Sequence, residues 1–349
     1  MERLGYRPAL DGIRGLAIVP VVLMHVFVWP REGSLGVDLF FVLSGFLITT
    51  LLLEERTLTG QISFASFYRR RVARLVPGLV VLIAVYAVAT HGARPWALLF
   101  ALTYTTNIAS LVDGNAIPWP LWHLWSLAQE EQFYLVWPPL FLLLTRARGV
   151  LAKALGLLIV AVIVEKLALI AAGAGLHRIY FGPDTHAEPI LIGCLFGTLS
   201  WWRPAFLRLT GLVALAAMMG TLLAAQWVSL FTPASPLRTL YFVACGFAII
   251  AATMPGPLAS FLAIRPLIFT GRISYSLYLW HVPVYAAVGM SAFDHRLGSC
   301  FAVAAAVAVA TLSFYVVEQP LRRRLRTSGS ARTRAAAVPA VLSAKPAPP

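Results

Sequence analysis

Apolar runs of about twenty residues recur along almost the whole chain, and short polar segments that contain most of the arginines separate them. A helix of about 20 residues crosses a hydrocarbon core roughly 30 Å thick. The pattern therefore predicts an all-α integral membrane protein, a polytopic bundle of about ten transmembrane helices. The expected spans are residues 11–30, 36–55, 76–92, 121–145, 152–173, 187–202, 208–227, 237–254, 263–290 and 298–320.

One further segment, residues 96–112, is apolar at its start but polar near its end, where Thr105, Thr106 and Asn107 follow one another. We expect this segment to be re-entrant or interfacial. With ten crossings, the arginine-rich loops all fall on one side, which the positive-inside rule assigns to the cytoplasm. An additional crossing would move every later basic loop to the opposite side. The rule therefore predicts that both termini are cytoplasmic.

The chain divides into two unequal parts. Residues 1–326 are expected to form one membrane domain, because apolar runs continue throughout them. Residues 327–349 are rich in Ser, Ala, Arg and Pro and have no apolar periodicity, so they cannot bury enough surface to fold. We expect them to form a disordered cytoplasmic tail.

The composition agrees with a membrane protein and indicates neither nucleic-acid binding nor a cysteine-based site. The 349 residues are 59% hydrophobic and only 12% charged, about half the charged fraction of an ordinary soluble domain. The net charge of +14 is explained by topology, so no nucleic-acid partner is expected. Cys194, Cys245 and Cys300 lie in or beside apolar runs without paired spacing, which indicates neither a disulfide framework nor a zinc site.

Ionisable side chains inside membrane helices are costly, so each is a functional candidate. Arg14 and His25 are eleven residues apart on the first helix, which places them on one helix face about 16 Å apart along the axis. One stripe thus joins a cation near the cytoplasmic surface to an imidazole farther across the membrane. The alternative is an anchoring arginine and a histidine that only bonds a neighbouring helix.

A second polar group lies at residues 122–134. His123 and Glu130 are seven residues apart and share a helix face, and Ser126 lies one turn from Glu130. Glu131 follows directly, so two carboxylates precede a long apolar run. They are candidates for orienting an imidazole or an arginine. The alternative is an interfacial tryptophan belt with acids at the helix start.

Two further groups have both a functional and a structural interpretation. Arg71 and Arg74 belong to a basic run that serves either as a cytoplasmic anchor or as a binding site for phosphates, which suit guanidinium geometry. Tyr278 and His281 form a polar stripe that either ties helices together or lines a substrate cavity. Asp184, His186 and Glu188 lie in a predicted outer loop. They do not provide a clear set of three metal ligands, so no metal site is expected there.

Several ordered motifs in this chain together resemble the bacterial membrane acyltransferase family three. The resemblance covers roughly residues 6–326. Its motifs are Arg14 with His25, residues 36–48, Arg71 and Arg74 before Pro77, residues 123–134, residues 274–281, and Glu318 before Pro320.

Members of that family O-acylate lipopolysaccharide sugars, peptidoglycan, nodulation oligosaccharides and macrolides. The resemblance implies that His25 is catalytic, that Arg14 is essential, and that Arg71 and Arg74 belong to the donor site. Asp38 and Ser44, within residues 36–48, join Ser126, His123, Tyr278 and His281 as other candidate pocket residues. The chain differs from the family in one respect, because residues 186–188 read His-Ala-Glu where members often have Arg-Ala-Asp.

The expected reaction transfers an acyl group from acyl-CoA to a sugar or macrolide hydroxyl at the bacterial cytoplasmic membrane. Acetyl is the acyl group that we expect first. Histidine can act as a base near neutral pH, so His25 is the expected base or acyl carrier, oriented by Glu130 or Glu131. Arg14 and the Arg71/Arg74 pair would hold the phosphates of coenzyme A, a co-substrate; no other cofactor is expected. The alternative function is a proton-coupled secondary transporter, which would require internal symmetry that the sequence does not display.

Overall fold

The computed structural model describes residues 4–92, 94–147, 149–199, 206–224, 227, 232, 235–288 and 295–323, and every regular element in them is helical. The elements are α1 (Pro8–Phe27), α2 (Leu35–Thr59), α3 (Phe64–Ala89), α4 (Pro95–Leu102), α5 (Thr106–Val112), α6 (Trp119–Trp122), α7 (Trp125–Leu144), α8 (Val150–Ala171), α9 (Leu176–Phe181), α10 (Glu188–Thr198), α11 (Leu207–Ala224), α12 (Leu237–Ala252), α13 (Pro257–Leu262), α14 (Arg265–Arg272), α15 (Ser274–Val288), α16 (His295–Ser313) and the π-helix η1 (Phe314–Glu318). The expected all-α class is confirmed, and the predicted tail at 327–349 lies outside the described residues.

The expected count of about ten crossings is not confirmed. Within the described ranges, six helices are long and apolar enough to cross a membrane, namely α1, α2, α3, α8, α11 and the continuous stretch Leu297–Arg323. α10 and α12 are apolar but shorter, and α15 has 15 residues. α7 has 20 residues, but its first half contains two glutamates and two glutamines. If α7, α10, α12 and α15 also span the membrane, the reason is their place in the bundle beside the longer helices, and not their length and hydropathy.

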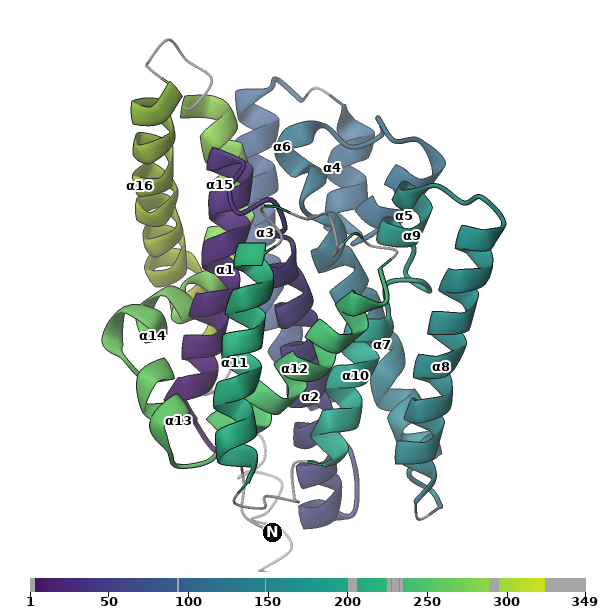
Figure 1. Ribbon diagram of the computed structural model, residues 1–349. Helices are drawn as coiled ribbons and strands as arrows, with labels where there is room; N and C mark the ends of the chain where they lie inside the picture. The colour runs from purple at the N-terminus through teal and green to yellow at the C-terminus, as the bar shows by residue number, and fades with distance from the viewer. Residues whose placement is uncertain are drawn as a thin grey trace, which may run out of the picture.

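The short helices gather at the two ends of the molecule (Figure 1). α4, α5, α6 and α9 lie at the end opposite the N-terminus, whereas α13 and α14 lie toward the N-terminal end. α4 and α5 occupy the region of residues 96–112 and have 8 and 7 residues, so neither can cross a bilayer. This agrees with the expectation that 96–112 is not a full crossing.

Two predicted boundaries are wrong. α3 begins at Phe64 rather than near residue 76, so the basic run 69–74 is helical and not a loop. Its start is capped by Ser63, whose side chain accepts a hydrogen bond from the Ser66 N–H, and arginine is itself a good helix former. The span expected at 263–290 is divided at Ile273 into α14 and α15.

α2 packs most extensively against α10, and glycines allow this close approach. A Cβ added to Gly45 of α2 would lie 2.0 Å from the carbonyl oxygen of Ile190, and one added to Gly193 of α10 would lie 2.1 Å from that of Val42. Each helix therefore presents a glycine to the backbone of the other. Such small-residue contacts are typical of membrane helices, which gain stability mainly from close packing.

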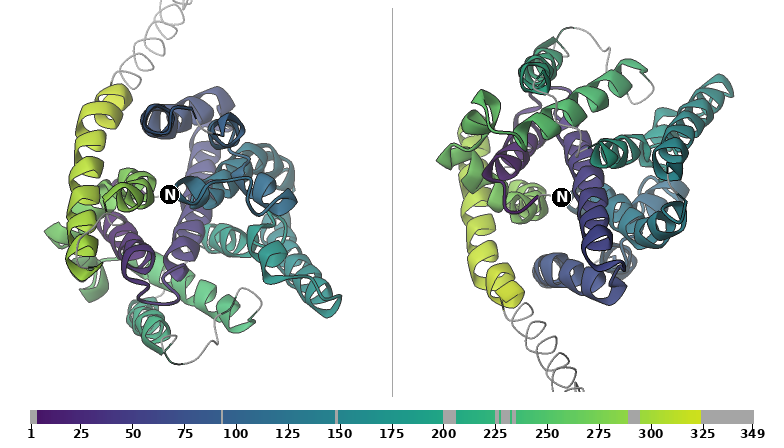
Figure 2. Two further views of the ribbon diagram at one scale, coloured as in Figure 1. Left: turned by 90° about the horizontal axis from the view of Figure 1, so that it is seen from above. Right: turned by 90° about the horizontal axis from the view of Figure 1, so that it is seen from below.

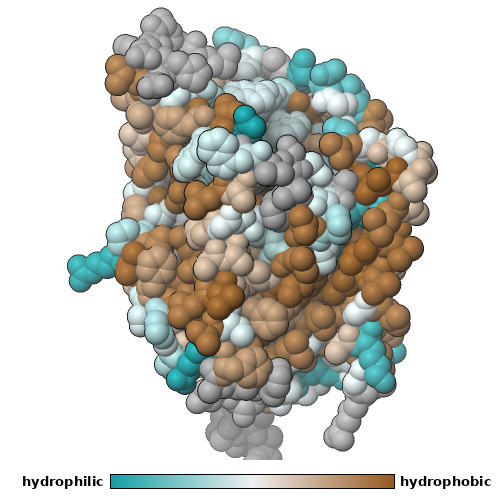
Figure 3. Space-filling view, in the orientation of Figure 1, coloured by the Kyte–Doolittle hydropathy of each residue, from teal (hydrophilic) through white to brown (hydrophobic). Residues whose placement is uncertain are grey.

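The surface between the two ends is mostly apolar. Figure 3 shows hydrophobic residues over most of the visible face, with hydrophilic residues gathered toward the upper and lower ends. α8 and α16 lie on opposite sides of the bundle in the end views (Figure 2). On α8, the apolar side chains of Leu157, Val160 and Val164 are all more than half exposed, as expected for a lipid-facing helix.

Candidate functional site

A cavity lies among α1, α2, α3, α7 and α15 and gathers residues that the sequence analysis had treated in separate motifs. It encloses about 730 Å³ of space not filled by protein atoms, including open solvent at its mouth. All three predicted donor-binding arginines line it. The other predicted site residues in its wall are Ser44, Ser126, Glu130 and Tyr278.

The arginines are held by different partners. Arg14 forms an ion pair with Asp11 at 2.9 Å, and the guanidinium carbon of Arg71 lies 3.5 Å from the ring centroid of Tyr134. Arg74 is repelled electrostatically by both Arg14 and Arg71. The cavity wall contains these three arginines and one carboxylate, that of Glu130. This excess of positive charge suits an anionic ligand.

Glu130 does not orient His25, which corrects the sequence-based expectation for the glutamates. Its Oε1 atom accepts hydrogen bonds from the Ser44 hydroxyl and, at 2.5 Å, from the Tyr134 hydroxyl. The carboxylate thereby belongs to the arginine-lined cavity. Glu131 interacts electrostatically with Arg71, and its buried Oε1 has no hydrogen-bond partner within the described part of the chain.

Three histidines from distant parts of the sequence form a cluster. The ring centroid of His281 on α15 lies 5.0 Å from that of His25 on α1 and 5.1 Å from that of His123, which follows α6. His123 and His281 are buried, and His25 is half-buried. All three histidines are predicted site residues, but their spacing in the sequence does not relate them to one another.

The hydrogen bonds define the tautomers of two of these histidines. His25 Nδ1 lies 2.8 Å from the carbonyl oxygen of Val21, which can only accept, so Nδ1 carries the proton. His281 Nδ1 donates in the same way to the carbonyls of Tyr278 at 2.8 Å and Leu277 at 3.1 Å. The Nε2 atom of His281 is then an acceptor, and it lies 3.3 Å from His25 Nδ1. His25 consequently presents an unprotonated Nε2.

Tyr278 connects the cavity to the histidine cluster. It lines the cavity, and its ring centroid lies 5.3 Å from that of His123 and 5.6 Å from that of His281. Its hydroxyl donates to the carbonyl oxygen of His123 at 2.5 Å and accepts from the Ser126 hydroxyl at 2.6 Å. The arginines and the histidines are therefore two regions of one site, with Tyr278 between them.

Residues 7–318 match the protein family described as "Acyltransferase domain". The chain belongs to this acyltransferase family. The match covers nearly the whole of the membrane domain expected at 1–326, and it confirms the resemblance drawn from the sequence motifs.

Curated relatives of this family member share about a third of its residues. The peptidoglycan O-acetyltransferase OatA of Listeria monocytogenes is 32% identical over 352 residues, covering 91% of this chain and 56% of that protein. The putative peptidoglycan O-acetyltransferase YrhL of Bacillus subtilis is 31% identical, covering 91% and 55%, and the O-acetyltransferase OatA of Staphylococcus aureus is 31% identical, covering 91% and 58%. The chain thus spans about half the length of these relatives. No solved structure matches it.

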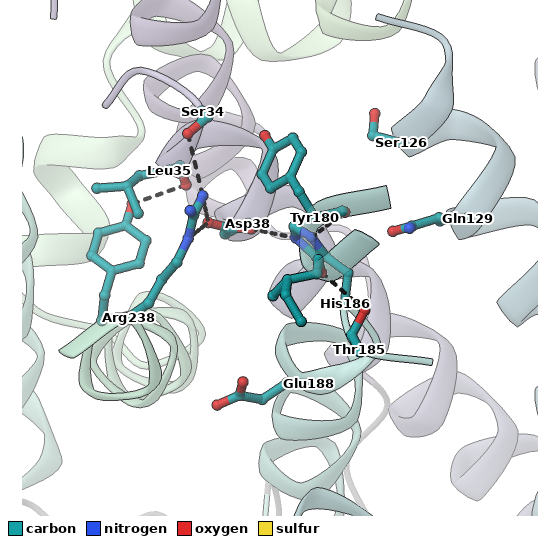
Figure 4. A network of polar contacts seen from close by, with 12 residues as sticks. Ser34, Leu35, Asp38, Ser126, Gln129, Tyr180, Thr185, His186, Glu188 and Arg238 are labelled. Carbon is teal, nitrogen blue, oxygen red and sulfur yellow. Dashed lines mark hydrogen bonds and ion pairs between the residues drawn. The ribbon is translucent and has the colours of Figure 1, made fainter. Parts of the chain in front are cut away.

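Asp38 lies outside the cavity of this acyltransferase family member, in a separate buried ion network (Figure 4). Arg238 of α12 donates from Nε to Asp38 Oδ2 at 2.8 Å, and its Nη2 lies 2.7 Å from the same oxygen. His186 Nε2 lies 2.9 Å from the other oxygen, Oδ1, and its Nδ1 donates to the carbonyl of Tyr180. Arg238 is not among the predicted site residues, because an arginine at the start of an apolar run is also typical of a membrane anchor.

The three polar residues of the predicted outer loop have separate partners, and Glu188 points away from Asp38 in Figure 4. Glu188 is fully buried and bonds Lys166 and the Thr239 hydroxyl. Asp184 pairs with Arg178. Partial burial raises the pKa of Asp184. Hydrogen bonds from Arg178 and a backbone N–H lower it by a larger amount, so that the pKa falls to about 2. These residues therefore hold neighbouring helices together in separate places and do not form one site.

Proposed function

We propose that this chain is a multi-pass O-acyltransferase of the bacterial cytoplasmic membrane, which moves an acetyl group from acetyl-CoA to a carbohydrate hydroxyl of the cell envelope. The family match and the names of the relatives support O-acetyl transfer to a glycan rather than to a macrolide. They also argue against the transporter alternative. The observation that carries the proposal is the arginine-lined cavity, which adjoins, through Tyr278, the histidine cluster in which His25 has an unprotonated Nε2.

The donor side of the proposal rests on charge. Coenzyme A carries several phosphate oxygens, and guanidinium groups bind phosphate with strong, charge-assisted hydrogen bonds. Arg14, Arg71 and Arg74 would supply such bonds at one end of the cavity. The cavity wall also contains Phe40, Leu43 and other apolar side chains, which suit the uncharged arm and the acyl group of the donor.

The chemical step rests on His25. In direct transfer, its Nε2 takes the proton of the acceptor hydroxyl as that oxygen attacks the thioester carbonyl carbon. The carbon–sulfur bond then breaks, and the departing thiolate receives the proton. In two-step transfer, Nε2 attacks the carbonyl carbon, the carbon–sulfur bond breaks, and the thiolate leaves. The hydroxyl oxygen then attacks the same carbon, the carbon–nitrogen bond breaks, and the released Nε2 takes the hydroxyl proton, which passes to the thiolate. Before either route begins, the Nδ1–H of His25 is held by the Val21 carbonyl and by His281 Nε2, so that Nε2 of His25 is the unprotonated nitrogen.

The test is His25→Gln, because an amide can replace the hydrogen bond to Val21 but cannot accept a hydroxyl proton at neutral pH. Transfer of labelled acetyl from acetyl-CoA is measured in membrane vesicles and normalised to folded protein. We expect a loss of about 100-fold or more, typical of removing a general base. His177→Gln is the matched control, because His177 is exposed on α9 and lies outside the cluster.

Retention of more than about a tenth of the wild-type rate by His25→Gln would contradict the proposed role. The acceptor is tested separately by mass spectrometry of envelope glycans from cells with and without the gene. A glycan that loses one acetyl mass when the gene is deleted supports a carbohydrate acceptor. Glycans of unchanged mass would contradict it.

A further inference from the structure

A second cavity adjoins the first at the end lined by Arg14 and Arg74. It encloses about 1180 Å³ of space not filled by atoms, again including open solvent, and lies among α1, α14, α15 and the segment after α16. Four residues line both cavities and form the boundary between them, namely Arg14, Arg74, Ser274 and Tyr275. A ligand that passes between Arg14 and Arg74 would therefore occupy both. We call the second cavity the vestibule.

The vestibule is strongly basic. To Arg14 and Arg74 it adds Arg272 from α14 and Arg322 and Arg323 from the C-terminal segment. The wall contains two carboxylates, and both are already engaged. Asp11 accepts from Arg14 at 2.9 Å and from the Tyr6 hydroxyl at 3.0 Å, and Glu318 accepts from the Ser276 hydroxyl. Five cations against two bonded acids leave a positive field that attracts a polyanion.

Aromatic rings stand in the same wall. The side chain of Tyr6 is 64% exposed and that of Tyr315 is 46% exposed, so both can be covered by a ligand. Tyr6 is held in place because Arg272 donates to its hydroxyl at 3.0 Å and lies over its ring. Exposed rings beside guanidinium groups are the combination that binds a nucleobase together with its phosphates.

We infer that the vestibule is a subsite for the 3′-phosphorylated ADP portion of the donor, with Arg272, Arg322 and Arg323 as its phosphate-binding residues. This inference rests on the proposed donor and makes it more specific. The phosphorylated adenosine occupies the polar vestibule, and the diphosphate lies at the boundary with Arg14 and Arg74, where Arg71 also lines the first cavity. The pantetheine arm continues from there along the apolar wall of the first cavity. A phosphomonoester carries a charge of about −1.5 to −2 at neutral pH, which matches the excess of arginines. The donor is then recognised by its nucleotide as well as by its acyl arm.

The experiment compares ligands of decreasing length on the full chain in neutral detergent. Calorimetry measures the binding of CoA, of dephospho-CoA, which lacks the 3′-phosphate, and of pantetheine, which lacks the nucleotide. The variants are Arg272→Ala and the double variant Arg322→Ala with Arg323→Ala. The matched control is Arg265→Ala, because Arg265 is exposed on the same helix as Arg272 but does not line the vestibule.

We expect wild type to bind CoA more tightly than dephospho-CoA, and both more tightly than pantetheine. Each vestibule variant should weaken CoA binding by about ten- to a hundredfold, which is typical of losing a hydrogen bond to a charged group. Pantetheine binding should be unchanged. In turnover, the KM for acetyl-CoA should rise while the KM for acetyl-pantetheine stays the same. Lysine variants at the same positions should recover part of the affinity, which excludes a folding defect.

Three results would overturn the subsite. These are equal wild-type affinity for CoA and pantetheine, equal weakening of both ligands in the variants, and displacement of CoA by phosphatidylglycerol micelles, which would assign the arginines to lipid headgroups. The proposed function fails separately. If CoA binding depends on the vestibule but no acetyl transfer occurs, the subsite stands and the reaction does not. If transfer proceeds without regard to the nucleotide, the reaction stands and the subsite does not.

Discussion

Replacing Asp38 with asparagine should destabilise the protein strongly, because it removes the carboxylate that pairs with the buried guanidinium of Arg238. The side chain of Asp38 is 1% exposed and that of Arg238 is 3% exposed. Both carboxylate oxygens are used, one by Arg238 and the other by His186. The network joins α2 to α12 and to the turn before α10, so three separate parts of the bundle depend on one side chain.

The expected magnitude follows from burial. Removing one partner of a buried ion pair costs about 3–5 kcal/mol. Even at about 2 °C per kcal/mol, the low end of the scale for larger domains, the unfolding midpoint should fall by about 6–10 °C. Glu165→Gln is the comparison variant. Glu165 is 42% exposed and lies 3.9 Å from Arg178, so its loss should cost less than about 1 kcal/mol.

The assay is thermal unfolding in detergent, followed by tryptophan fluorescence, together with acetyl transfer normalised to folded protein. The double variant Asp38→Asn with Arg238→Met should recover much of the lost midpoint, because it removes the buried cation together with its carboxylate. A fall of less than about 2 °C for Asp38→Asn would refute this reasoning. An unchanged midpoint with abolished transfer would instead indicate that Asp38 takes part in the reaction, as expected when it was placed among the candidate pocket residues.

Three shorter predictions concern the site and the topology. His281→Asn should lower kcat by about tenfold or less, which is the effect of one lost hydrogen bond. The KM for acetyl-CoA should stay unchanged. A change in KM alone would argue against a positioning role for His281. Arg71→Ala should raise the KM for acetyl-CoA by about tenfold or more. Arg70 is exposed on the same helix, so Arg70→Ala should leave this KM unchanged. Equal KM values for the two variants would favour a purely anchoring role for Arg71. Reporter fusions at Gly114 and Gly182 should read outside the cytoplasm, and a cytoplasmic reading at either would contradict the proposed orientation.

Much of the fold could be predicted because helices in a membrane have to be apolar over a set length. The first helix was expected at 11–30 and is found at Pro8–Phe27, and the second was expected at 36–55 and is found at Leu35–Thr59. The approach failed where polarity was treated as a boundary. The basic run 69–74 continues a helix, since arginine side chains at the membrane edge can reach water without interrupting the backbone hydrogen bonds.

The candidate site was predictable residue by residue but not as an assembly. Helical spacing relates Arg14 to His25 because both lie on one helix, and the same reasoning applies to Ser126 and Glu130. It cannot relate His25 to His281, which is 256 residues away in sequence and meets it only through packing. For the same reason Glu130 was assigned to an imidazole, although its partners come from Ser44 on a different helix and Tyr134 on its own. Arg238 was missed because one arginine beside an apolar run is indistinguishable from a membrane anchor.

Tyr278 has a consequence for the energy balance of the cell. A bacterial membrane stores energy as a proton-motive force, and a continuous column of water through a membrane protein would dissipate it. The arginine-lined cavity opens toward one end of the bundle, and His25 lies toward the other end of α1. The ring of Tyr278 lies between the cavity and the histidines, with its hydroxyl bonded to Ser126 and to the His123 carbonyl. In the proposed reaction, the acyl group would pass from the cavity to His25 beside this ring, and a ring held in that position would interrupt a water column there.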